Sequence, residues 1–140
     1  MKILCNLFQF SSSRSVLIQH RESLISKINA ILEEIEAPSN IVQICISSII
    51  MNYCVHLVSN PDQEASFQLV SSIGTNCLAS MNSQEALYRV VASFGALIKQ
   101  DRETKELAQA LESRTALARI KCDNSEKLQE CVKDCKTLLS

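Results

Sequence analysis

The chain has 140 residues, enough for one domain with a single hydrophobic core. Hydrophobic residues make up 46% of it and aromatic residues only 4%, and its 2 glycines and 2 prolines are too few for the many tight turns of a sheet protein. Its 14 basic and 15 acidic residues give a net charge of -1, which argues against a broad nucleic-acid-binding surface.

The sequence predicts neither a membrane span nor a signal for export. The longest apolar stretch covers residues 44–58 and falls short of the roughly 20 clean apolar residues that cross a bilayer, since polar side chains interrupt it. The N-terminus is too short, and becomes polar too soon, for a secretory signal. We therefore expect a cytoplasmic or nuclear protein whose partners are neither nucleic acid nor membrane.

Apolar residues recur at helical spacing along nearly the whole chain, which predicts helices joined by short polar loops. The first predicted helix ends at three serines that begin with Ser11, and a short turn over 14–19 leads to the next. In chain order, the predicted helices cover about 2–10, 21–36, 40–58, 62–79, 83–99, 102–111 and 124–139.

The breaks between these helices carry capping chemistry, because helices favour a short polar side chain at the N-cap. Asn60 and Pro61 are interpreted as an N-cap followed by a first-turn proline. Asn82 with Glu85 is typical of an N-terminal capping box. Asp123 is expected to open the last helix in the same way.

Every second predicted helix begins about 41 residues after its counterpart, within the window of roughly 40 to 47 residues typical of HEAT and armadillo repeats. We therefore expect an all-α, armadillo/HEAT-like helical-repeat solenoid of about three helix pairs, forming a single domain over residues 1–140. Such a solenoid has an extended concave face suited to peptides. Gly74 and Gly95 lie inside predicted helices, where each is expected to mark a close helix crossing.

Three alternate helices are apolar over most of their surface, yet each carries one narrow polar line. In a solenoid these lines would face the groove, where amides and cations can hydrogen-bond an extended ligand, and Arg89 with Lys2 could hold a carboxylate. An ordinary solvated helix face has the same pattern, and this alternative stays open. The lines are Lys2, Asn6 and Gln9; Gln43, Ser47, Asn52 and His56; and Glu85, Arg89 and Ser93.

No residue pattern indicates a catalytic, metal or cofactor site. His20 and His56 have no partner at the spacing of a nucleophile or metal motif, and the sequence has no glycine-rich phosphate loop. We expect no enzyme activity, no cofactor and no bound metal; a thiol hydrolase that uses one of the cysteines is an alternative. Most cysteines lie at core-like positions typical of buried, reduced thiols, namely Cys5, Cys45, Cys54 and Cys77.

Several segments, in matching order and spacing, resemble the PUL domain, an armadillo-like module. These are LCNLF at 4–8, QHRESL at 19–24, NIVQI at 40–44, MNY at 51–53, EALYR at 85–89, FGALI at 94–98 and the closing helix around Cys131. A whole PUL domain is roughly twice this long, at six repeats of armadillo length, so the chain resembles the C-terminal half only.

The resemblance implies a protein-binding adaptor that holds the C-terminal tail of valosin-containing protein, a hexameric AAA ATPase of the ubiquitin–proteasome pathway, in a basic concave groove. Arg89 stands where the family has an arginine of that groove, and Asn6, Asn52 and Tyr53 fall on its polar positions. Lys2 replaces a family arginine, and lysine lacks the fork that grips a carboxylate at two points. The predicted peptide-binding groove comprises Lys2, Asn6, Gln43, Asn52, Tyr53, Arg89 and Ser93.

A function of another class is also compatible with the sequence. A half-solenoid without tail binding could assemble with itself through its exposed N-terminal repeat, because a terminal repeat normally carries a polar cap. The predicted first helix instead presents apolar residues such as Leu4, Leu7 and Phe8.

Overall fold

The computed structural model describes the backbone of residues 11–140 and the side chains of residues 14–140. The predicted helix over 2–10, and with it Lys2 and Asn6, lies outside the described residues. Every regular element in the described part is helical. The elements are α2 (Ser11–Gln19), α3 (Arg21–Glu34), α4 (Asn40–Ser59), α5 (Gln63–Ser72), the π-helix η1 (Ile73–Cys77), α6 (Leu78–Ser80), α7 (Gln84–Gln100), α8 (Arg102–Ala110), α9 (Ser113–Ala118) and α10 (Glu126–Leu138).

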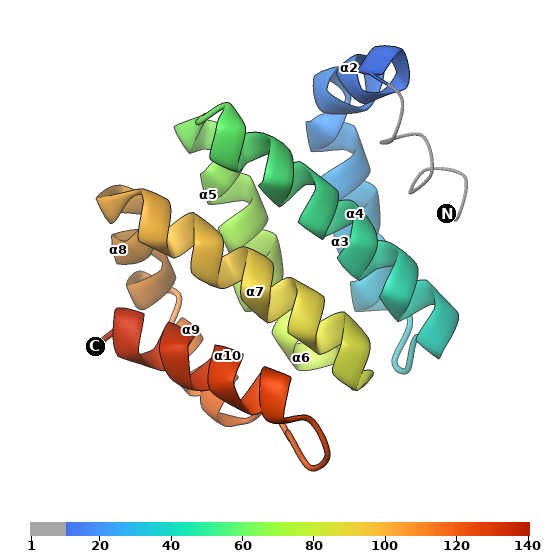
Figure 1. Cartoon of the computed structure of the whole chain (residues 1–140). Helices are drawn as coiled ribbons and strands as arrows, with labels where there is room; N and C mark the ends of the chain where they lie inside the picture. The colour runs from blue at the N-terminus through green and yellow to red at the C-terminus, as the bar shows by residue number, and fades with distance from the viewer. Residues whose placement is uncertain (1–10) are drawn as a thin grey trace.

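The helices stack in two layers (Figure 1). In one layer α4, α7 and α10 lie side by side, with α7 packed against α4 on one flank and α10 on the other. In the second layer α5 packs between α3 and α8. Taken in chain order, residues 21–140 give three helix pairs that alternate between the two layers, α3 with α4, α5 with α7 and α8 with α10. This confirms the predicted all-α helical-repeat fold.

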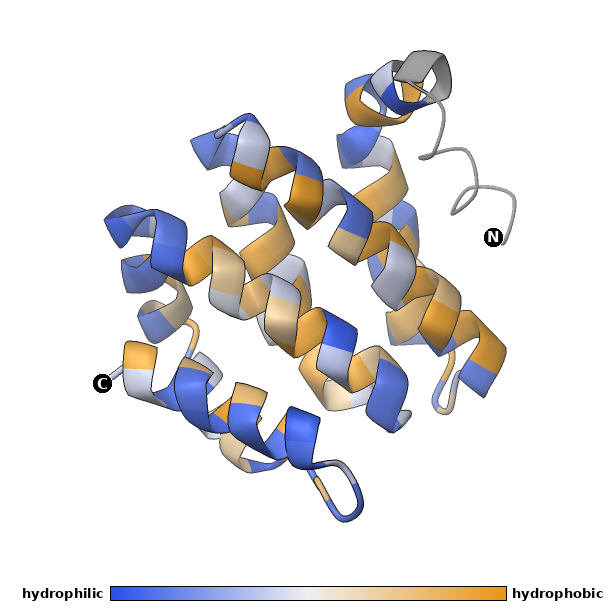
Figure 2. Ribbon diagram, in the orientation of Figure 1, coloured by the Kyte–Doolittle hydropathy of each residue, from blue (hydrophilic) through white to orange (hydrophobic). Residues whose placement is uncertain are grey.

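The apolar character of α4 is explained by its place in the core. By length and composition alone this helix could cross a membrane, although no membrane span was predicted for it. In the structure, 50% of its most apolar window is buried inside the protein. Figure 2 shows hydrophobic residues along most of the helix. The buried residues of α4 are Gln43, Cys45, Ile46, Ser47, Ile49, Ile50, Tyr53, Cys54 and Leu57.

The N-cap predicted for α5 is wrong by two residues. Asp62 caps this helix, and its Oδ1 accepts a hydrogen bond from the backbone N–H of Ala65 at 3.1 Å. Asn60 instead ends α4, where its Nδ2 donates to the carbonyl of His56 at 3.2 Å. Pro61 therefore follows a helix C-terminus, a position that suits a residue unable to continue the helix.

Serines cap the next two long helices of the first layer, in place of the residues predicted. Ser83, not Asn82, caps α7, and Ser125, not Asp123, caps α10. Each serine Oγ accepts from the backbone N–H three residues ahead, at 3.4 and 3.2 Å respectively. The sequence thus predicted the correct kind of capping side chain, but each capping residue lies one or two positions further along the chain.

Two helical segments were not predicted. Residues Ser11–Gln19 form α2, although a helix end and a turn were expected, because serines favour turns and caps. Leu17 in α2 is buried, and its carbonyl accepts a hydrogen bond from the Tyr53 hydroxyl, so tertiary contacts help to hold this segment. The short α9 begins after Glu112, whose φ of 55° is left-handed, and buries Leu117.

Both glycines mark close approaches, as predicted. A Cβ built on Gly95 would lie 2.9 Å from the Sγ of Cys135, so α7 and α10 can approach this closely only because the side chain is absent. A Cβ on Gly74, in η1, would lie 3.1 Å from the Oγ of Ser113 at the start of α9.

Cysteine burial agrees with the prediction wherever the structure describes it. Cys45, Cys54 and Cys77 are buried, and burial raises the pKa of the Cys77 thiol to about 12. Cys5 lies outside the described residues. Such thiols are poor nucleophiles at neutral pH, because the thiolate is the reactive form.

Candidate functional site: the outer surface of α4 and α7

Exposed apolar residues gather along one side of α4. Ile41 is 62% exposed, Val55 61% and Val58 52%, and Met51 is 38% exposed on the same side. On the neighbouring α7, Tyr88 is 36% exposed. We call this the α4–α7 surface, made of Ile41, Ser48, Met51, Asn52, Val55 and Val58 of α4 together with Glu85, Tyr88 and Arg89 of α7.

Arg89 bridges the two helices of this surface. Its Nη1 donates to the Oγ of Ser48 on α4 at 2.6 Å, and its Nη2 forms an ion pair with Glu85 one turn earlier on α7. The Arg89 side chain stays 27% exposed. Because these two contacts use one N–H of each terminal nitrogen, the guanidinium keeps other N–H donors for a ligand.

Gln43 does not line the α4–α7 surface, because its side chain is buried at 2% exposure. Its Nε2 donates to the carbonyl of Pro38 and to Oδ1 of Asn82, both at 2.8 Å. Its Oε1 accepts from the backbone N–H groups of Asn82 and Ser83, at 2.9 and 2.8 Å. The amide thus joins the α3–α4 loop to the α6–α7 loop and has no hydrogen-bonding capacity left for a ligand.

Tyr53 and Ser93 are also internal. Tyr53 is 1% exposed, its hydroxyl donates to the carbonyl of Leu17 at 2.6 Å, and burial raises its pKa to about 12. The Oγ of Ser93, 3% exposed, donates to the carbonyl of Arg89 at 2.7 Å. Both side chains help to shape the helices beneath the surface.

Asn52 lies on the α4–α7 surface. It is half-buried, one helical turn after Ser48, so the two lie on the same side of α4. With Arg14, Val55 and His56 it lines a depression of about 190 Å³. Among the predicted groove residues, the structure therefore brings Asn52 and Arg89 to one surface, and ligand contact by either stays a prediction.

Sequence reasoning missed Ser48 and the exposed apolar residues. In α4 the predicted polar line included Ser47, which is fully buried and donates to the carbonyl of Ile44, whereas the adjacent Ser48 contacts Arg89. No exposed apolar residue was predicted on this helix, because nothing local tells which side of an apolar helix remains uncovered. For the neighbouring α7, the signal available in the sequence was Arg89 itself, the one basic residue in the predicted polar line of that helix.

In the part of the chain with described side chains, His, Cys, Asp and Glu residues form no group of three that could hold a metal ion. The cysteine pair on α10 is close enough to interact: a hydrogen bond from Cys135 lowers the pKa of Cys131. Cys135 itself is buried, and its pKa is raised by its contact with Cys131 and by desolvation.

An exposed apolar surface with a partly exposed cation, on a two-layer helical repeat, is suited to binding another protein. The model of the PUL domain family matches residues 1–134, and the chain belongs to this family of protein-interaction modules. It is 25% identical over 143 residues to phospholipase A-2-activating protein of Xenopus laevis, an alignment that covers 100% of this chain. The chain spans 17% of the length of that relative.

Proposed function

We propose that the chain is an adaptor that binds the C-terminal tail of the AAA ATPase valosin-containing protein on the α4–α7 surface. Arg89 holds a carboxylate of the tail, and Met51, Val55 and Tyr88 contact its apolar side chains. Membership in the PUL family supports the choice of partner. The observation that carries the proposal is a partly exposed guanidinium with unused N–H donors, set between exposed apolar residues of two neighbouring helices.

The proposal includes the setting in which this binding takes place. The chain acts as the C-terminal half of a PUL domain, in the ubiquitin–proteasome pathway of the cytoplasm or nucleus. Its activity is binding and not catalysis. Cell fractionation of the endogenous protein checks the location, and recovery only with sealed membrane compartments contradicts it.

Glu85 competes with the tail for Arg89. The pair is an i,i+4 contact on a helix and the Glu85 side chain is 56% exposed, so breaking it costs little, since exposed pairs of this kind contribute about 0–1 kcal/mol. Ser48 does not compete with the tail, because its hydrogen bond holds the Arg89 guanidinium toward α4 whether or not a ligand is bound. A tail carboxylate can therefore use the free donors of Arg89 or take the place of Glu85.

A labelled peptide with the sequence of the ATPase tail tests the proposal by fluorescence anisotropy. Arg89→Ala should weaken its binding by about tenfold or more, because a charge-assisted hydrogen-bond pair is lost. Glu85→Gln should strengthen it a few-fold, because the internal competitor loses its charge.

Arg102→Ala is the matched control. Arg102 also pairs with a glutamate one turn away, Glu106, and is 88% exposed, but it lies on α8 in the other layer. We expect unchanged affinity for this variant. Equal affinity of wild type and Arg89→Ala would remove Arg89 from the site, and no binding by either would remove the proposed function.

The self-assembling half-solenoid remains the second candidate function. The observation in its favour is the same row of exposed apolar side chains on α4, above all Ile41, Val55 and Val58. Surfaces of this kind mark protein contacts, and a second copy of the chain is also a protein.

A further inference from the structure

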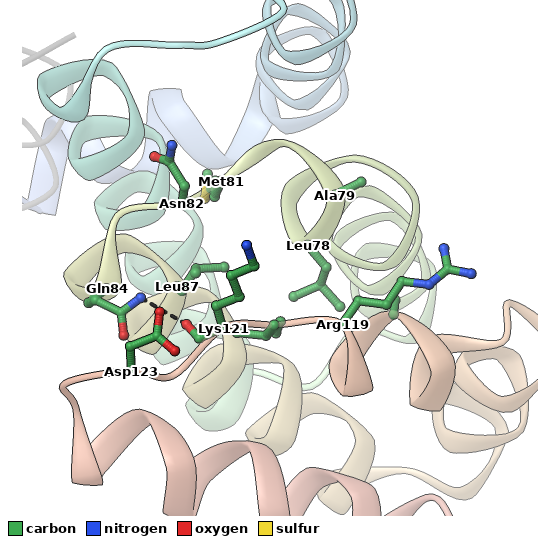
Figure 3. A pocket seen from close by; sticks show the side chains of 11 residues that line it. Leu78, Ala79, Met81, Asn82, Gln84, Leu87, Arg119, Lys121 and Asp123 are labelled. Atoms are coloured by element: carbon green, nitrogen blue, oxygen red, sulfur yellow. Dashed lines mark hydrogen bonds between the residues drawn. The ribbon is translucent and has the colours of Figure 1, made fainter.

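A second concave site lies between the α6–α7 loop and the segment that joins α9 to α10 (Figure 3). It is a pocket of about 540 Å³. It does not belong to the α4–α7 surface, since Leu87 on its wall and Arg89 are two positions apart and point to different sides of α7. The apolar residues that line it are Leu78, Ala79, Met81, Leu87, Ala116 and Ile120.

The rim of this pocket carries two cations. Arg119 and Lys121 are exposed and line the pocket, and among the described residues no carboxylate lies within ion-pair distance of either. Asp123 also lines the pocket, but Figure 3 shows the Arg119 and Lys121 side chains directed away from it. The rim thus has a charge of +1, with two cationic groups free to meet a negatively charged ligand.

The wall of the pocket also holds a buried hydrogen-bond acceptor without a donor. Nε2 of Gln84 donates to the carbonyl of Lys121 at 2.9 Å, which sets the orientation of the amide (Figure 3). The Oε1 of the same amide is buried, and no donor in residues 14–140 reaches it. Buried acceptors of this kind are rare. Because this oxygen is closed off from solvent, a ligand in the pocket does not contact it without a rearrangement of the side chain.

We propose that this pocket binds a short acidic peptide segment of a partner protein. One apolar side chain of the segment enters the pocket between Leu78, Leu87 and Ile120. Aspartate or glutamate residues beside it pair with Arg119 and Lys121. The apolar cavity matches the apolar side chain of such a peptide, and the free cations match its acidic residues.

The test uses three capped nonapeptides and the isotope-labelled chain, followed by NMR. The first peptide has a central leucine flanked by aspartate and glutamate, the second has glycine in place of leucine, and the third has asparagine and glutamine in place of the acids. We expect the first to shift the amide signals of Leu87, Ala116 and Lys121. Each of the other two should bind about tenfold more weakly, because one of the two contacts is missing.

The double substitution Arg119→Glu/Lys121→Glu should weaken the first peptide by about tenfold or more. Its matched control is Lys27→Glu/Lys127→Glu, which makes the same charge change at exposed positions on α3 and α10 outside the pocket. We expect less than about a twofold effect from this control, because distant charges are screened. Since all four side chains are exposed, both variants should keep the fold.

Three results would overturn the proposal. These are equal binding of the leucine and glycine peptides, equal loss in the two charge-reversal variants, and signal shifts that avoid the pocket. A concentration-dependent dimer in sedimentation that Arg119→Glu/Lys121→Glu abolishes would identify the occupant as a second copy of the chain. Arg89→Ala should leave binding of the first peptide unchanged, which separates this site from the ATPase-tail site.

Discussion

At the scale of single residues, burial separates structural polar side chains from those that can meet a ligand. Gln43, Tyr53 and Ser93 each have 3% exposure or less and each is hydrogen-bonded inside the protein. A buried polar group must find such partners, because it has lost its hydrogen bonds to water. Arg89 is partly exposed and keeps unused donors. The four residues were predicted as one set, and only Arg89 among them has a free binding group.

Tyr53→Phe tests this division. The variant removes the hydroxyl that pairs with the carbonyl of Leu17, so it should lower the free energy of unfolding by about 1–2 kcal/mol. Urea denaturation measures this loss. The exposed Tyr88→Phe should change stability by less than about 0.5 kcal/mol. Unchanged stability of Tyr53→Phe together with lost tail binding would instead place Tyr53 in the groove.

At the scale of elements, loops of successive repeats are joined by side chains as well as by helix packing. The Gln43 amide begins in α4, reaches back to Pro38 before that helix, and receives two N–H groups from the loop that leads into α7. The linked residues are about 40 positions apart in sequence, close to one repeat length. This one amide therefore helps to fix how the second helix pair packs on the first.

Gln43→Ala should destabilise the protein by about 2–4 kcal/mol, because it leaves a carbonyl and two N–H groups unpaired in a buried place. Gln129→Ala is the control: this amide is exposed and donates only to the carbonyl of Cys122, so its loss should cost less than about 1 kcal/mol. Thermal and urea unfolding measure both. Equal stability of the two variants would show that the link between the loops is energetically unimportant.

At the scale of the whole molecule, the exposed sides of α4 and α10 differ in polarity. The exposed side of α10 carries charged residues, among them Lys127, Glu130, Lys133 and Asp134. The exposed side of α4 is apolar instead. An uncovered apolar row on one helix suits a contact with another protein, and the two candidate functions differ in which protein that is.

Val55→Lys distinguishes them, because it places a charge in the centre of the apolar row on α4. We expect the wild-type chain to sediment as a monomer and Val55→Lys to weaken tail binding by about tenfold, since a buried apolar contact is lost. Val16→Lys, at a 54% exposed position on α2, is the control and should leave binding unchanged. A wild-type dimer that Val55→Lys converts to monomers would favour self-assembly.

The sequence by itself determined the class of fold, the order of the long helices and the family. Apolar periodicity and capping residues act within one or two turns, so they can be read without the rest of the chain. The short α9 and the helix over residues 11–19 were not predicted, because they depend on tertiary contacts such as that between Leu17 and Tyr53. N-caps were predicted with the correct chemistry and shifted by one or two positions.

Only the tertiary structure decided which polar residues face outward. In α4 nearly all sides are apolar, so its uncovered side depends on where α7 and the second layer pack. Gln43 is buried because its partners Asn82 and Ser83 arrive from the next repeat. Arg89 stays partly exposed, and its hydrogen-bond partner on α4 is the small Ser48. Such facts arise from residues about 40 positions apart, beyond the reach of any local pattern.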